Sequence, residues 1–220
     1  MYDLHFEALV PYAPLLLRGL GVTLYVSVFA LLVGILSGLL LAFARLSRFP
    51  LLTVPAYLFI DFLRGVPLLV LLIFIYYGVS IFTGINIPAI GAAVGGLGIF
   101  YGAYMSEIFR AGILAVDKGQ TEAAVALGMT RMRVFQRVTL PHAFRTVLPP
   151  ITNSFISLVK DSSLVSVLAI SDLTREGQEI VVATFRAFEA YTAIALVYYA
   201  ITTILSVFST MLERRIRRGQ

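Results

Sequence analysis

Residues 19–44 read GLGVTLYVSVFALLVGILSGLLLAFA and contain no charged side chain. About 20 apolar residues are enough to cross the hydrocarbon core of a bilayer, so this stretch predicts a membrane-spanning helix. Arg45 and Arg48 follow it, and lysine and arginine accumulate in cytoplasmic loops. We therefore expect the C-terminal end of this span to be cytoplasmic and the N-terminus of the chain to lie outside.

The composition of the whole chain agrees with a membrane protein. Of its 220 residues, 59% are hydrophobic and only 13% are charged, whereas about a quarter of the residues of a soluble domain are charged. The chain has no cysteine, which excludes a disulfide framework and a thiolate metal site. Its net charge of +5 comes from arginines that flank the apolar runs. We interpret them as signals of membrane topology and expect no nucleic-acid partner.

Five spans are predicted, which makes the chain an all-α integral membrane protein. The uncharged stretch from Gly65 to Ser106 is too long for one crossing, and the turn residues of 83–88 divide it. Asp61, Arg64 and Pro67 leave the start of the second span open. The predicted spans are about 19–44, 51–79, 88–113, 146–170 and 190–212.

The connections between the spans carry the charges. Segment 114–145, with four arginines and one lysine, is predicted to be cytoplasmic, and 171–186 to lie outside. The arginine-rich C-terminal tail is expected inside. An odd number of spans agrees with termini on opposite sides of the membrane.

The cytoplasmic segment contains Glu122-Ala-Ala-Val-Ala-Leu-Gly128 and, further on, Leu140-Pro141. Small Ala123 and Ala124 allow the close approach of another protein, and Glu122 places a carboxylate near a helix start. Gly128 can adopt the left-handed conformation that ends a short helix. We expect two short helices to meet at this glycine and the segment to bind a soluble partner.

Two pairs of opposite charges lie three residues apart near the ends of apolar runs: Asp61 with Arg64, and Glu107 with Arg110. This spacing lets the two members of a pair meet on one helix face. Both pairs are predicted to be structural ion pairs, with a lining role in a transport path as the alternative for Arg64.

Lys160 and Asp161 lie well inside the fourth apolar run, and Asn153, Ser154 and Ser157 precede them. One interpretation is a structural ion pair; the other is a polar path for a solute that carries both charges, as a free amino acid does. Adjacent residues diverge by about 100° on a helix. Both side chains can therefore face one cavity only if the helix is broken there or a second subunit completes the site.

Three glycine pairs have the spacing that lets helix backbones approach closely: Gly34 with Gly38, Gly91 with Gly95, and Gly98 with Gly102. They predict packing within one subunit or contacts between subunits. The chain has no phosphate-binding GxxxxGK[ST] loop and no protease or hydrolase motif. It is thus predicted not to be an enzyme, to bind no cofactor of its own, and to depend on another chain if ATP drives it.

Four further motifs complete the pattern: FLRGVPLL at 62–69, YMSEIFRAGI at 104–113, GQTEAA at 119–124 and NSFISLVKD at 153–161. With them, nearly the whole chain resembles the permease subunits of polar amino acid ABC importers, of the histidine, glutamine and arginine uptake type. The resemblance implies the type I ABC importer permease fold and a prokaryotic plasma membrane.

The resemblance also implies partners: a second permease subunit, a cytoplasmic ATPase dimer that binds ATP and Mg, and an extracytoplasmic solute-binding protein that delivers an amino acid. The predicted substrate path is Lys160, Asp161, Asn153, Ser154, Ser157 and Arg64. The predicted ATPase contact is Glu122, Ala123, Ala124, Gly128, Leu140 and Pro141. A passive channel or ion-coupled secondary carrier for small polar solutes is the alternative, and a membrane scaffold is a third possibility that leaves Lys160 and Asp161 without a role.

Overall fold

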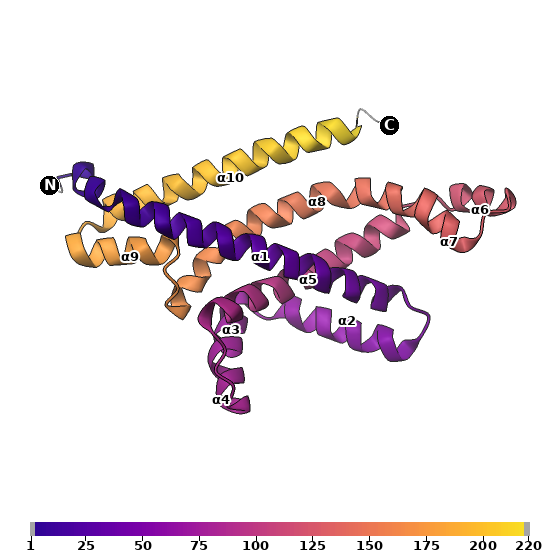
Figure 1. The fold of residues 1–220 in the computed structure, drawn as a ribbon, viewed down its shortest axis with the longest axis horizontal. Coiled ribbons are helices and arrows are strands. Elements are labelled where there is room, and N and C mark those ends of the chain that lie inside the picture. Colours follow the sequence, from indigo (N-terminus) through magenta and orange to yellow (C-terminus); the bar gives the residue numbers. More distant parts are fainter. Residues whose placement is uncertain (1–2, 218–220) are drawn as a thin grey trace.

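The computed structural model describes residues 3–217, and every regular element in that range is a helix (Figure 1). The elements are, in chain order, the 3-10 helix η1 (Phe6–Tyr12), α1 (Ala13–Leu46), α2 (Pro50–Gly65), α3 (Leu68–Ile73), the π-helix η2 (Phe74–Val79), α4 (Ser80–Thr83), α5 (Ala89–Leu114), α6 (Lys118–Ala126), α7 (Arg131–Val134), the π-helix η3 (Phe135–Thr139), α8 (Leu140–Asp161), the 3-10 helix η4 (Ser162–Leu168), α9 (Leu173–Thr184) and α10 (Ala187–Arg217).

Helices α1 and α5 form the centre of the molecule, and glycines line their contact. A Cβ atom on Gly34 would lie 3.3 Å from the carbonyl oxygen of Gly98, and one on Gly38 would lie 3.0 Å from that of Gly102. Two of the three predicted glycine pairs therefore pack against each other within the subunit. The third does not, because Gly91 is exposed and nothing lies within 4 Å of a Cβ on Gly95.

An ion-pair cluster holds the same two helices together near their C-terminal ends. Glu107 pairs with Arg110, as predicted, at 2.9 Å, and it also pairs with Arg45 of α1 at 3.2 Å. The guanidinium of Arg45 lies over the ring of Tyr57 in α2, 4.9 Å from its centroid. One carboxylate thus links α1 and α5, and α2 covers the cluster.

The predicted second span, 51–79, is not one straight helix. It breaks at Val66 and Pro67, and the segment Leu68–Thr83 turns away from α2 by 109°. Val66 has extended backbone angles (φ −95°, ψ 135°), which a residue before proline adopts because the proline ring disfavours the α conformation there. Figure 1 shows the resulting arm, α3 to α4, standing out from the bundle. The next break falls in the predicted turn, where Gly84 has φ +71°.

The predicted fourth span, 146–170, is part of a longer helical segment. The rod runs from Arg131 to Leu168 and, after a bend of 53°, continues as α9. Residue Ala169 makes the bend with φ +57°, and the Asp172 carboxylate then caps α9 by accepting hydrogen bonds from the amides of Thr174 and Arg175 at 3.2 and 3.0 Å. The polar segment 114–145 is accordingly mostly helical and includes the first turns of α8.

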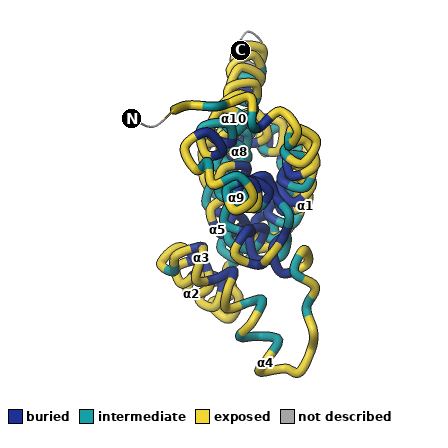
Figure 2. Tube along the Cα trace, turned by 90° about the vertical axis from the view of Figure 1, so that its left-hand side faces the viewer, coloured by how far each residue is buried: buried dark blue, intermediate teal, exposed yellow. Residues whose placement is uncertain are grey.

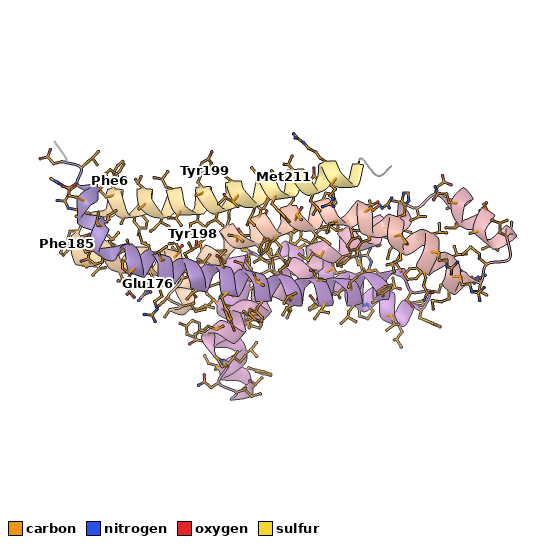
Figure 3. The ribbon with its side chains drawn as sticks, turned by 45° about the horizontal axis from the view of Figure 1, so that its top comes forward. Phe6, Glu176, Phe185, Tyr198, Tyr199 and Met211 are labelled. Carbon is orange, nitrogen blue, oxygen red and sulfur yellow. The ribbon has the colours of Figure 1, made fainter. Side chains whose placement is uncertain are left out.

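Segment 171–186, predicted as an outer connection, is largely the helix α9 packed against α1. The amide of Leu173 donates to the hydroxyl of Thr23 at 3.1 Å, and a Cβ on Gly19 would lie 2.9 Å from the carbonyl oxygen of Asp172. Glu176 is only 3% exposed on the face of α9 that meets Gly19; it and Tyr198 mark this region in Figure 3. The charges of α9 had hidden the apolar spacing of Leu173, Gly177 and Ile180, which is that of one helix face.

The described helices give an elongated molecule. Helices η1 and α9 lie at one end, α6 and α7 lie at the other, and the C-terminal end of α10 is displaced toward the α6 end (Figure 1). Buried residues concentrate where α1, α5, α8 and α9 meet, whereas the arm and much of α10 are exposed (Figure 2). In the described range, three helices are long and apolar enough to cross a membrane, or up to five if each bent pair is one span.

Candidate functional site

A polar pocket of about 400 Å³ lies between α5 and α8. Helix α5 contributes an aromatic wall, and α8 contributes amide, hydroxyl and carboxylate groups. The lining residues are Phe100, Tyr101, Tyr104, Asn153, Ser154, Ser157 and Asp161. Four residues of the predicted substrate path are thus brought together, in a volume typical of small-molecule sites.

Asp161 is fixed at the end of α8 by a residue far away in sequence. The hydroxyl of Tyr101 donates a hydrogen bond of 2.6 Å to Asp161 Oδ2. Helix α8 ends at Asp161 and continues as the tighter η4, so the helix changes type after Asp161 but is not interrupted there. Because the helical rod continues through η4 to Leu168, the carboxylate of Asp161 is itself the group that attracts a cation at this end of the pocket.

Arg64 does not form the predicted ion pair with Asp61. Among residues 3–217 that the structure describes, no ion pair joins them; instead the Arg64 guanidinium lies over the ring of Tyr104, 5.3 Å from its centroid. The arginine comes from the last turn of α2, next to the Pro67 break. Since Tyr104 lines the pocket, Arg64 is a cation beside the pocket that is not neutralised by Asp61.

Lys160 occupies a different position from Asp161. Its side chain is exposed and is not part of the pocket lining, as expected for adjacent residues on a helix. In the described part of the chain, Lys160 and Asp161 do not form an ion pair with each other. The structural-pair interpretation of these residues is therefore wrong for the isolated subunit.

The aromatic wall was not among the predicted site residues. Phe100 and Tyr104 have ring centroids 5.2 Å apart, and Phe100 and Tyr101 have centroids 5.7 Å apart. Phenylalanines and tyrosines in an apolar run are ordinary in a membrane helix. The available signal was Tyr101 and Tyr104 at helical spacing, because their two hydroxyls require polar partners inside the bundle.

A second candidate surface is formed by α6 and α7 at the far end of the molecule (Figure 1). Asp117 caps α6 by accepting a hydrogen bond from the amide of Gln120 at 3.2 Å, and Gly128 has φ +81° after its last turn. The predicted left-handed Gly128 after a short helix is confirmed, but the helix that begins at Arg131 is the start of the long rod Arg131–Leu168 and is not a second short helix. Glu122 lines a hollow of about 480 Å³ between α6 and the segment Arg131–Thr139.

The two alanines of this surface differ. Ala123 is exposed, but Ala124 is 7% exposed and packs within the chain. Only Ala123 is therefore free to approach another protein directly.

Leu140 and Pro141 begin α8, just after the π-helical η3. Proline cannot donate the backbone hydrogen bond of a regular helix, and a wider π turn before it avoids the ring clash.

Known proteins match this arrangement along nearly the whole chain. Residues 30–218 match the family model described as binding-protein-dependent transport system inner membrane component. The glutamine transport system permease protein GlnP of Escherichia coli (strain K12) is 40% identical over 96% of this chain and 97% of its own length. The arginine transport system permease protein ArtQ of Bacillus subtilis (strain 168) is 35% identical over 98% of both.

Solved structures agree. The crystal structure of an amino acid ABC transporter with histidines contains a chain that is 41% identical, with a TM-score of 0.92 over 97% of this chain and 100% of that one. Inward-facing MetNI methionine ABC transporter shares the fold at 21% identity and a TM-score of 0.76, covering 94% of this chain and 98% of that one. These matches exclude the channel, the secondary carrier and the scaffold. The chain belongs to the family of binding-protein-dependent transport system inner membrane components and is the inner membrane permease of an amino acid ABC transporter, a subunit that is not itself the ATPase.

Proposed function

We propose that the pocket between α5 and α8 receives a free amino acid, with its ammonium group at Asp161 and its carboxylate at Arg64. The observation that carries this proposal is the Tyr101–Asp161 hydrogen bond of 2.6 Å, which fixes a carboxylate on the pocket wall. Arg64 supplies the opposite charge, and its guanidinium has the fork geometry that suits a carboxylate. Asn153, Ser154 and Ser157 offer hydrogen bonds to a polar side chain.

Lys160 has a separate place in this proposal. It is exposed on the α8 surface one residue from the pocket lining, so it reaches a substrate only along an approach path or in a site that a second subunit completes. Gly91 and Gly95 of α5 form an open small-residue face that supports contact with a second permease, either another copy or a relative.

The proposed orientation places the N-terminus and α9 outside and α6, α7 and the C-terminal tail in the cytoplasm. Arg131, Arg133, Arg137 and Arg145 on the α6–α8 side support it. A cytoplasmic ATPase dimer, with ATP and Mg, then contacts the surface around Glu122, Ala123 and Gly128. An extracytoplasmic solute-binding protein delivers the substrate at the opposite end. ATP-driven closure of the ATPases reaches the pocket as rigid-body movement of the helices.

The test is uptake by the transporter reconstituted in proteoliposomes, with ATP enclosed and a panel of amino acids including glutamine, arginine and histidine. We expect ATP-dependent accumulation of one or a few polar amino acids. Asp161→Asn should remove it while the ATPase still copurifies, and Asp61→Asn, which changes an exposed carboxylate outside the pocket, should not. Uptake that proceeds without ATP, or that survives Asp161→Asn, contradicts the proposal.

A further inference from the structure

A second groove in the molecule is built entirely from apolar side chains and shares no lining residue with the pocket between α5 and α8. It has a volume of about 320 Å³ and lies between α1, α5 and the first half of α8. Phe109, Ala143 and Val147 form its buried floor, being 4–7% exposed. Phe43 and Phe144, 52% and 59% exposed, flank its opening. The groove is therefore a notch in the outer surface of the helix bundle.

The length of the groove matches one leaflet of a membrane. On α1 it extends from Ile35 to Phe43 and on α8 from Leu140 to Ile151. At 1.5 Å per residue these stretches are roughly 12 and 16 Å long. Half of a hydrocarbon core is about 15 Å thick. Ile35 lies near the middle of the uncharged run 19–44 and Phe43 at its C-terminal end, so the groove covers the half of the bilayer on the side of α6 and α7.

The groove is too small to enclose a protein helix. A helix with a diameter of about 10 Å and a length of about 15 Å fills roughly 1,200 Å³, whereas all the space between the groove's atoms amounts to about 890 Å³. Water is also excluded as an occupant, because a dry apolar wall offers it no hydrogen-bond partner. An extended hydrocarbon chain has the required shape and chemistry.

Two arginines lie close along the chain to groove residues at the end of the groove nearest α6 and α7. Arg48 follows the end of α1, and Arg137 lies between Phe135 and Leu140, two of the groove's lining residues. Both side chains are exposed, and within residues 3–217 neither forms an ion pair. Uncompensated arginines beside a membrane surface attract anionic lipid head groups.

We propose that this groove is a binding site for an anionic phospholipid of the cytoplasmic leaflet, with one acyl chain between α1 and α8 and the phosphate near Arg48 and Arg137. The leaflet assignment rests on the proposed orientation, which cysteine labelling tests independently. The acyl chain fills a space that would otherwise leave Phe109 and Val147 without packing partners on one side. All lipid tails around the protein are as apolar as the groove itself, so apolarity alone does not select one lipid. The shape of the groove and the charge of the head group make the selection.

The experiment uses the transporter purified through a tag on this chain, with the subunits that copurify, in phosphatidylcholine vesicles. A trace of phosphatidylglycerol with a diazirine on its acyl chain is photolysed, and the cross-linked peptides are identified by mass spectrometry. We expect labelling concentrated in 35–43 and 140–151. A phosphatidylcholine probe of the same design should label these peptides about tenfold less.

Two matched comparisons decide the result. Leu39→Trp fills the groove and should lower its labelling about tenfold, whereas Leu36→Trp, on a 64% exposed position of the same helix outside the groove, should not. The double variant Arg48→Gln, Arg137→Gln should reduce phosphatidylglycerol labelling to the phosphatidylcholine level, while Arg215→Gln on α10 leaves it unchanged. The arginine variants leave the packing intact and so decide the question even if Leu39→Trp fails to assemble. Labelling spread evenly over the exposed helices, or equal for both probes, overturns the proposal.

Discussion

Arg64 and Asp161 lie on different helices, and each is presented by a helix end. Asp161 is held by Tyr101 where α8 ends, and Arg64 is held over Tyr104 where α2 ends. Two neighbouring residues of α5, one helical turn apart, thus position two opposite charges. Such fixed charges can select a zwitterion without reorganising when it binds, which lowers the cost of binding.

The guanidinium of Arg64 is proposed to bind the carboxylate of the substrate. Arg64→Gln removes a charge-assisted contact of about 2 kcal/mol, so the KM for amino acid uptake should rise roughly thirtyfold. Arg64→Lys keeps the charge but not the planar fork, and it should fall between wild type and Arg64→Gln. Uptake kinetics in proteoliposomes measure this. An unchanged KM in Arg64→Gln would show that the guanidinium does not meet the substrate.

At the scale of helices, apolar runs predicted most of the fold because the bilayer constrains span length so strongly. The break at Pro67 was signalled, but its angle of 109° depends on what α3 packs against. Helix α9 was missed because Asp172, Glu176 and Glu179 made its segment look like a solvent-exposed connection. For the site, the polar residues of α8 could be selected from the sequence. The hydrogen bond of Tyr101 to Asp161 and the exposure of Lys160 outside the pocket could not, because they depend on how the helices are rotated and packed.

Helix α5 offers a matched pair of glycines for a packing test. A Cβ on Gly102 would overlap the Ser37 side chain of α1, whereas one on Gly95 has nothing within 4 Å in the subunit. Gly102→Val should destabilise the subunit by about 1–3 kcal/mol through overpacking, and Gly95→Val should not. Thermal unfolding of the detergent-solubilised subunit measures the difference. Equal midpoints for the two variants would contradict the α1–α5 contact.

The turn after α6 depends on the left-handed conformation of Gly128. Gly128 has φ +81°, where a β-branched residue is strained by about 1–3 kcal/mol and asparagine is tolerated. Gly128→Val should therefore weaken copurification of the ATPase and abolish ATP-driven uptake, with membrane insertion intact. Gly128→Asn should retain both the copurification of the ATPase and ATP-driven uptake. Normal ATPase binding by Gly128→Val would exclude this turn from the contact.

For the whole molecule, the separation of α9 from α6 along the long axis predicts opposite sides of the membrane (Figure 1). The chain has no cysteine, so single cysteines can be introduced without background. Glu179→Cys is the labelling probe for the outer side, because Glu179 is exposed whereas Glu176 is buried. Lys118→Cys is the labelling probe for the inner side. An impermeant maleimide should label position 179 but not 118 in intact cells. The reverse pattern would invert the topology.

The face of α10 that points away from the bundle is apolar and exposed. Tyr199 and Met211, 69% and 63% exposed, point outward (Figure 3), and much of α10 is yellow in Figure 2. An apolar helix face of this kind is stable only against lipid or another apolar subunit. The permease is thus built to act inside a membrane assembly.

In the proposed mechanism, the pocket between α5 and α8 binds the amino acid through Asp161. The most direct measurement is equilibrium binding of the radiolabelled amino acid that the uptake panel identifies, on the purified transporter without ATP. We predict that Asp161→Asn weakens binding at least tenfold, that Asp61→Asn leaves it unchanged, and that both variants copurify with the same subunits as wild type. Wild-type affinity in Asp161→Asn would show that the amino acid does not bind through this carboxylate.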